Sequence, residues 1–231
     1  MILTVNSAKI FLLILHAVCT YHGMTPPQSL PQERETKRIN VSDYISNTIQ
    51  FQLKATRVTK FFFCSSALLE ALLLLLNSHK KFFNLECSLA QGTSTSATVI
   101  VLSCSLATLG GLIRIWCHRS LRSQFTWQMA VRDHHQLITS GPYSVIRHPG
   151  YTGWLLMTIG NISFLIHYAT SWRYGLLYSA MAIATSMYMS VLMFLLFGRM
   201  KKEDKVLYEH FGIQWELWAI STPYALIPWV Y

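Results

Sequence analysis

Five long apolar runs divide this chain, and they constrain its fold more than any other feature of the sequence. They cover roughly residues 2–21, 58–76, 97–116, 151–168 and 174–197. A helix needs about 20 residues to cross the hydrocarbon core of a bilayer, so each run is close to one span. Only 13% of the 231 residues are charged, whereas a soluble domain averages about 25%. The sequence therefore predicts an all-α integral membrane protein with about five transmembrane helices.

The first apolar run has two readings. It is either a retained span or a cleaved signal peptide. Lys9 is the only charged residue before position 33, so the run lacks the basic segment that opens a signal peptide. No clear A-x-A cleavage site follows it. We expect a retained span, with the cleaved signal as the alternative.

The net charge of +9 lies mainly in two loops, 22–57 and 117–150. Nucleic acid is one partner that would attract such a charge, but no basic platform interleaved with aromatic residues is visible, so none is expected. Basic loops are instead typical of the cytosolic side of membrane proteins. With five spans, both loops and the C-terminal segment fall on one side, which we expect to face the cytosol.

Two regions follow from this organisation. Residues 1–96 are expected to hold the N-terminal spans and a linker, in which 24–38 shows no core pattern and is predicted to be flexible. Residues 97–231 are expected to hold three spans, the long polar loop and an amphipathic C-terminal segment. The five cysteines have no CxxC spacing, so neither a disulfide framework nor a metal site is expected.

The polar stretch GPYSVIRHPGYTG at 141–153 stands directly before the fourth run. Gly141 and Pro142 are a turn signal, and Pro149 biases His148 towards an extended conformation. His148 is therefore predicted to lie on a corner before a helix that begins near Tyr151. Free backbone N–H groups at such a helix start would suit an anion or a polar ligand. The alternative is a re-entry turn that only contacts lipid headgroups.

Arg199 and Glu203 stand four residues apart on the polar extension of the fifth run. This spacing puts both side chains on one helix face. An ordinary ion pair on a solvated helix would have the same spacing. Ionisable residues at a membrane boundary are nevertheless functional candidates. Segments 117–150 and 198–231 lie on the same predicted side, and we expect them to form together a cytosolic cap over a membrane-embedded pocket.

The order of these motifs resembles the isoprenylcysteine carboxyl methyltransferase family. The matching residues are GPYxxxRHPxYxG at 141–153, RxxxED at 199–204, FGxxW at 211–215 and PYxxIP at 223–228. The likeness covers about residues 106–231. It implies an endoplasmic reticulum enzyme with its active site facing the cytosol. Such an enzyme uses S-adenosylmethionine to methylate the C-terminal carboxylate of a prenylated cysteine in CaaX-processed proteins.

The resemblance also implies site residues. It makes Arg199 the contact of the substrate carboxylate. It places the cofactor against Gln128, His135, Gln136, Leu137, Ile138, Tyr143, His148, Pro149, Gly150, Tyr151 and Glu203. The chain departs from the family at Asp204, where glutamate is usual, and at Trp215 and Trp218, which replace tyrosines. A carboxylate is ionised at neutral pH, so the reaction needs neither a general base nor a metal.

Three other readings remain open. A phospholipid or small-lipid methyltransferase would share the corner, but Arg199 would repel a protonated amine substrate. A sterol-ring reductase resembles only the C-terminal core, and a non-enzymatic scaffold would not need Arg199 and Glu203 beside the corner. The sequence leaves open the preferred prenyl length, the proteins that are modified and the oligomeric state.

Overall fold

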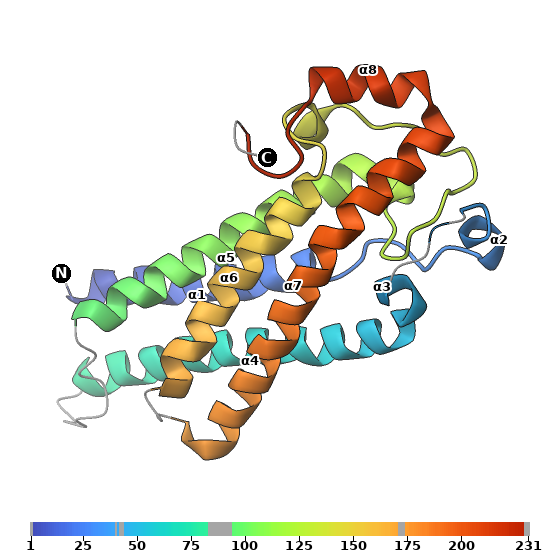
Figure 1. Cartoon of the computed structure of the whole chain (residues 1–231). Coiled ribbons are helices and arrows are strands. Elements are labelled where there is room, and N and C mark those ends of the chain that lie inside the picture. Colours follow the sequence, from blue (N-terminus) through green and yellow to red (C-terminus); the bar gives the residue numbers. More distant parts are fainter. Residues whose placement is uncertain (1, 40, 42–43, 83–93, 171–173, 229–231) are drawn as a thin grey trace.

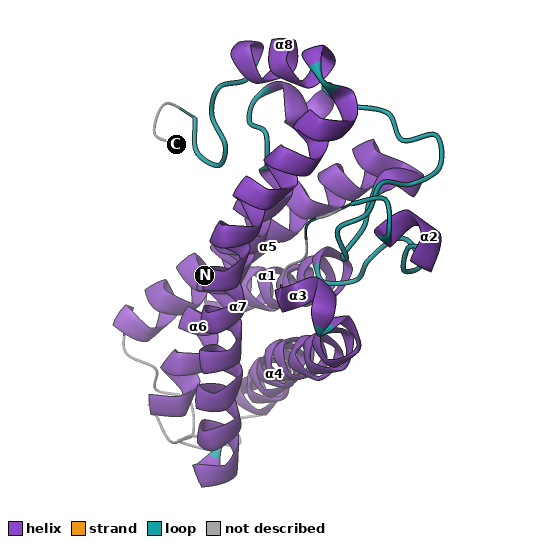
Figure 2. Ribbon diagram, turned by 45° about the vertical axis from the view of Figure 1, so that its right-hand side comes forward, coloured by secondary structure: helices purple, strands orange, loops and turns teal. Residues whose placement is uncertain are grey.

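Helices make up all the regular structure of the described residues in this computed structural model, which are 2–39, 41, 44–82, 94–170 and 174–228 (Figures 1 and 2). The all-α prediction is confirmed. The long helices are α1 (Ile2–Gly23), α4 (Ile49–Phe82), α5 (Ser94–Leu121), α6 (Pro149–Thr170) and α7 (Gly175–Phe211). The short elements are α2 (Glu33–Thr36), α3 (Tyr44–Asn47), α8 (Ile213–Ser221) and the 3₁₀ turns η1 (Arg122–Gln124) and η2 (Gly141–Ser144).

Three helices in the described part of the chain are long and apolar enough to cross a membrane by length and composition. They cover Ile49–Asn77, Ala97–Gln124 and Gly175–Phe211. The membrane class is thus supported, and these spans begin or end several residues outside the predicted runs. The 22-residue helices α1 and α6 form where expected but are not among the three, so their crossing stays a prediction. Residues 171–173 of the predicted tight connection lie outside the described residues.

Helix α5 packs against both α1 and α6, and small residues allow the close approach (Figure 1). A Cβ atom on Gly160 of α6 would lie 2.5 Å from the backbone nitrogen of Ala107 in α5. A Cβ atom on Gly111 of α5 would lie 2.6 Å from the carbonyl oxygen of Cys19 in α1. Since lipid tails are as apolar as leucine, such close backbone packing is a main source of helix association in membranes.

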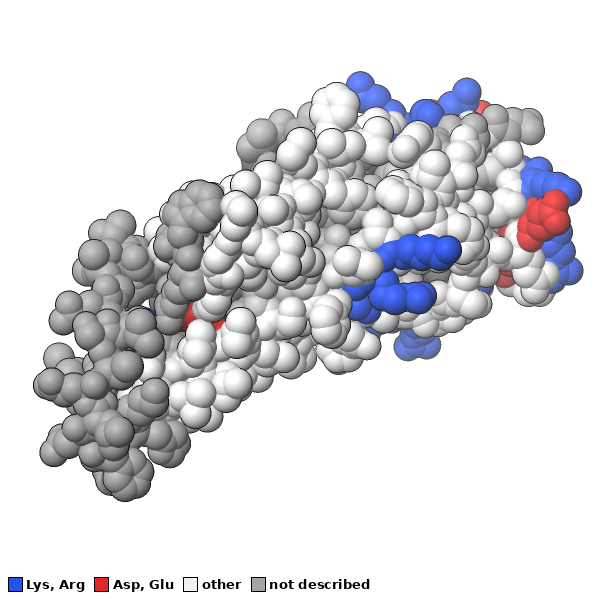
Figure 3. All heavy atoms as spheres, turned by 90° about the horizontal axis from the view of Figure 1, so that it is seen from below, with Lys and Arg blue, Asp and Glu red and all other residues white. Residues whose placement is uncertain are grey.

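Lysine and arginine gather towards one end of the face drawn in Figure 3, and most of the described surface away from that end carries no charged residue. The elements α2, α3, α8 and the loop before α6 lie at the same end of the helix bundle (Figures 1 and 2). We refer to this end as the cap. The distribution agrees with the basic loops from which the cytosolic side was predicted.

Residues 24–38, which were predicted to form a flexible linker, are instead docked on residues 125–140, the cap loop, so that prediction is wrong. We call residues 29–39 the strap. The Glu35 carbonyl accepts from the Val131 amide at 3.3 Å, and the Glu35 carboxylate accepts from the Asp133 amide at 3.2 Å. Arg34 and Arg38 form ion pairs with Asp133 at 2.7 and 2.5 Å. These partners lie more than 90 residues away in sequence, beyond the reach of local composition.

Candidate active site

A cavity lies where the cap meets the ends of the long helices. Its walls come from the loop after α5, from the corner before α6, from α7 and from the first turn of α4. Its empty volume is about 1360 Å³, the open mouth included. The cavity therefore takes its lining from the cap as well as from the long helices.

The corner before α6 is held by backbone pairing as well as by its prolines. Gly141 opens η2 at φ +65°, a left-handed conformation that favours glycine. Pro149 is the first residue of α6, where its missing N–H removes no helical bond. Just before it, the His148 amide donates to the Ala225 carbonyl at 2.9 Å. The prediction that His148 lies on a corner before a helix is confirmed.

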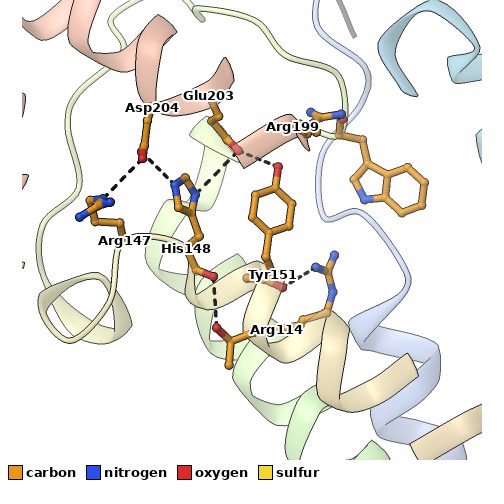
Figure 4. A network of polar contacts seen from close by, with 10 residues as sticks. Arg114, Arg147, His148, Tyr151, Arg199, Glu203 and Asp204 are labelled. Carbon is orange, nitrogen blue, oxygen red and sulfur yellow. Dashed lines mark hydrogen bonds and ion pairs between the residues drawn. The ribbon is translucent and has the colours of Figure 1, made fainter. Parts of the chain in front are cut away.

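The His148 imidazole ties this corner to α7 (Figure 4). Its Nε2 lies 2.9 Å from Oδ1 of Asp204, and its side chain is only 6% exposed. Arg147 pairs with the other oxygen of Asp204 at 3.5 Å. The residue that departs from the family pattern thus holds two adjacent residues of the RHP motif.

Tyr151 and Glu203 meet at the cavity wall. The Tyr151 hydroxyl donates to Oε2 of Glu203 at 2.6 Å, and Nδ1 of His148 lies 3.9 Å from the same oxygen (Figure 4). The Glu203 side chain is 36% exposed. One side of its carboxylate is therefore held by the corner while the rest remains open to a ligand.

Arg199 lies one helical turn before Glu203, towards the membrane. Its Nη2 donates to the Trp127 carbonyl at 2.6 Å, and its guanidinium also contacts the Tyr151 phenol. The residue is 5% exposed and lines the cavity. Arg199 and Glu203 therefore present opposite charges to one cavity, as the i,i+4 spacing predicts.

Most of the residues implied by the family resemblance line this cavity. They are His135, Gln136, Leu137, Ile138, Tyr143, His148, Gly150, Tyr151, Arg199 and Glu203. Gln128 and Pro149 are not among the lining residues, although their neighbours Trp127 and Gly150 are. Trp218 lines the cavity too, and its Nε1 donates to the Tyr143 carbonyl at 3.0 Å, which fixes α8 against η2.

Burial sets the protonation of two cap residues. Burial, with a smaller contribution from the nearby His210, lowers the pKa of His135 to about 4. Burial also raises the pKa of Tyr143 well above 10. Both side chains are therefore neutral at pH 7, so they offer hydrogen bonds and ring faces rather than charge.

The start of α6 offers less than the sequence predicted. The backbone N–H groups of Tyr151 and Thr152 both donate to the His148 carbonyl, at 3.0 and 3.2 Å. The expectation that the helix start has backbone N–H groups free for an anion is therefore wrong for these two residues. Charge at the site comes from side chains instead.

Arg114 of α5 is a cavity residue that sequence reasoning missed. Its Nε donates to the Gly23 carbonyl at 2.6 Å and its Nη1 to the Gly150 carbonyl at 3.0 Å. The guanidinium lies over the Trp154 ring, 4.8 Å from its centroid. An arginine inside the apolar run 97–116 was a signal that pointed to it, because intramembrane ionisable residues mark functional sites.

Among the described lining residues, two side chains other than arginine have a buried polar atom without a hydrogen-bond partner. The two atoms are Nε1 of Trp154 and Nδ1 of His135. Buried polar atoms are nearly always hydrogen-bonded in proteins. Together with the half-open Glu203 carboxylate, these atoms suit a bound polar ligand that carries both hydrogen-bonding groups and a positive charge.

Fold and site together define an all-α membrane protein with a charged pocket at the base of a polar cap. Residues 101–209, from α5 to the end of α7, match the model of the Isoprenylcysteine carboxyl methyltransferase (ICMT) family. A relative from Arabidopsis thaliana, "Protein-S-isoprenylcysteine O-methyltransferase B", is 29% identical over 79 residues. These findings support this family for the chain and confirm the resemblance seen in the sequence.

The match to the Arabidopsis protein covers 30% of this chain and 40% of the relative's length. No solved structure matches the chain at a significant level. The activity and substrates of this chain are therefore inferred from the site.

Proposed function

We propose that this protein transfers a methyl group from S-adenosylmethionine to the C-terminal carboxylate of a prenylated cysteine in CaaX-processed proteins, which gives a methyl ester. The observation that carries the proposal is the placement of Arg199 and Glu203 in one cavity, one helical turn apart. A carboxylate substrate and a cationic cofactor need these two opposite charges side by side.

The cofactor site would be formed by the corner and the cap loop. S-adenosylmethionine supplies an electrophilic methyl group on a sulfonium when it is bound. Glu203 would balance the cofactor's ammonium group. The partnerless atoms of Trp154 and His135 would hydrogen-bond its polar groups. Tyr143 and Tyr151 would pack on the cofactor, and Tyr151 also holds Glu203 in place.

Arg199 would bind the substrate carboxylate. A carboxylate is already ionised at neutral pH and nucleophilic enough to need no base. Guanidinium binds a carboxylate through two parallel N–H···O bonds, which fixes its orientation as well as its position. Burial of Arg199 strengthens this interaction, since water screens it poorly there. The chain's contribution is therefore to orient the reactants and to exclude water.

The lining of the cavity below Arg199 suits the prenyl group. On this side α7 contributes Leu192 and Leu196, and Ile45 and Met129 add apolar surface from the cap. A polar cofactor from the cytosol and a lipid-borne substrate would thus enter from different directions. The family and the basic loops support placement in the endoplasmic reticulum membrane with the cap in the cytosol.

The test is to incubate membranes that contain the protein with radiolabelled S-adenosylmethionine and a farnesylcysteine analogue. We expect label in a base-labile methyl ester of the analogue. Label in a base-stable phospholipid headgroup would instead identify a lipid amine methyltransferase. Absence of label in both products would contradict a methyltransferase of either kind.

A further inference from the structure

The cavity ends on its membrane side at Gln52, in the first turn of α4. We call Gln52 and its hydrogen-bond partner Tyr188 the wall. Gln52 lines the cavity and is 3% exposed. Its Nε2 donates to the Thr48 hydroxyl at 3.1 Å, and its Oε1 accepts from the Tyr188 hydroxyl at 2.8 Å. Because both ends of the amide are engaged, the side chain is held in one orientation.

Tyr188 is the part of the wall that comes from α7. It lies one turn beyond Leu192, which is the lining residue of α7 farthest from the cap. Besides Gln52, its hydroxyl lies 3.5 Å from Oγ1 of Thr56 in α4. Its ring meets Phe51 of α4 edge-on, with centroids 6.5 Å apart. Polar and aromatic contacts therefore close the space between α4 and α7 at this level.

The same seam between α4 and α7 continues beyond the wall. The rings of Phe62 and Tyr178 lie 5.3 Å apart, and the Tyr174 hydroxyl donates to Glu70 at 2.6 Å. Long side chains, rather than closely packed backbones, thus connect the two helices along the seam. If the contact of Gln52 with Tyr188 is removed, the cavity can extend in this direction.

We propose that Gln52 and Tyr188 set the length of prenyl chain that the enzyme accepts. The inference rests on the proposed function, with the substrate carboxylate at Arg199. Leu192 is seven residues and Tyr188 eleven residues from Arg199, or about 10 and 16 Å along the helix axis. A prenyl chain that runs from Arg199 past Leu192 meets the Gln52 amide at its far end. A chain longer by one isoprene unit requires that the wall move.

The test compares kcat/KM for geranylgeranylcysteine and farnesylcysteine analogues. Gln52→Ala and Tyr188→Ala are each expected to raise the ratio of longer to shorter substrate at least about tenfold, the scale on which hydrophobic pockets discriminate small apolar extensions. Leu192→Phe narrows the path and is expected to lower the same ratio. Tyr178→Ala is the matched control, because it removes a tyrosine of the same helix beyond the wall, and it should leave the ratio unchanged.

The outcomes separate the two proposals. If the wild-type protein methylates neither analogue, the proposed function fails. If it methylates the analogues and the ratio in Gln52→Ala equals that of wild type with S-adenosylmethionine binding retained, the length inference is overturned. If the alanine variants lose cofactor binding through misfolding, Leu192→Phe decides, because it keeps every hydrogen bond of the wall. An unchanged ratio in Leu192→Phe would then overturn the inference.

Discussion

The imidazole of His148 lies 2.9 Å from the carboxylate of Asp204, which joins two motifs that are 56 residues apart in the chain. The first motif forms the corner before α6, and the second lies at the polar end of α7. Glu203, next to Asp204, points to Tyr151 of the same corner (Figure 4). Two adjacent acids therefore have different tasks. Asp204 holds the corner to the helix, and Glu203 remains half open to the cavity.

Replacement of Asp204 by asparagine tests the structural half of this division. The change removes the charge that holds His148 and Arg147, while the side chain keeps its size. Hydrogen bonds to charged groups contribute about 1.5–3 kcal/mol, so we expect the dissociation constant of S-adenosylmethionine to rise roughly tenfold or more. Glu209→Gln, an exposed acid on the same helix, is the control and should bind the cofactor normally. Unchanged affinity in Asp204→Asn would show that the corner holds its shape without the tie.

The strap permits a comparison of a buried and an exposed acid. Glu35 is buried and accepts from two backbone amides, those of Gln32 and Asp133. Asp133 pairs with arginines at the surface, where ion pairs contribute about 0–1 kcal/mol. We expect Glu35→Ala to speed proteolysis of the strap and to lower thermal stability clearly, and Asp133→Asn to do so weakly. The reverse order would mean that the surface pairs, not the Glu35 bonds, hold the strap.

The long helices and the corner were predictable because their causes are local. Apolar runs indicate spans, Pro149 indicates a helix start, and four-residue spacing puts Arg199 and Glu203 on one face. The strap was not predictable, because its bonds join residues about 95 positions apart and its composition resembles that of a loop. The tie between His148 and Asp204 has the same character, since only the fold brings the two motifs together.

Arg114 is a different case, because its signal was present in the sequence. A charged residue inside an apolar run indicates a buried partner or a site, and the structure provides both. The wall formed by Gln52 and Tyr188 had no such signal. Each is a common residue near a span, and their pairing depends on how α4 lies beside α7.

His135 predicts a pH dependence of stability. Burial lowers its pKa to about 4, whereas an unfolded histidine has a pKa of about 6.5. Between these values the unfolded state binds the extra proton, so the free energy of unfolding should fall as pH decreases from 6.5 to 4. Thermal unfolding in detergent at pH 7, 6 and 5 measures the effect. His135→Gln should reduce the fall, whereas His134→Gln, at the exposed neighbour, should not; equal falls in all three proteins would exclude His135 as the cause.

Membrane topology provides an independent prediction. The cap carries the basic loops, so it should face the cytosol. A glycosylation reporter fused after Tyr231 should remain unmodified in microsomes, while one inserted between α4 and α5 should be glycosylated. The opposite pattern would place the cap in the lumen, away from cytosolic S-adenosylmethionine.

The role assigned to Arg199 is tested by its own chemistry. Arg199→Lys keeps the positive charge but loses the planar fork that holds a carboxylate through two bonds. Loss of a charged hydrogen bond in a buried site corresponds to about 1.5–3 kcal/mol, or roughly ten- to a hundredfold in kcat/KM. Glu203→Gln should act mainly on cofactor affinity instead, because its proposed partner is the ammonium group of the cofactor. The two residues share one helix face, so the effects of a double variant need not add.

Inhibition by a prenylcysteine acid and by the matching carboxamide separates the two roles. The acid carries the charge that Arg199 would bind, and the carboxamide has the same shape without that charge. Wild type and Glu203→Gln should both prefer the acid when the cofactor is saturating, whereas Arg199→Lys should lose most of this preference. If wild type shows no preference, or if the preference survives in Arg199→Lys, then Arg199 does not bind the substrate carboxylate. The charge that orients the substrate would then have to come from another residue of the cavity. Arg114 is a buried arginine of the lining, and its guanidinium donates to the Gly150 carbonyl at the corner.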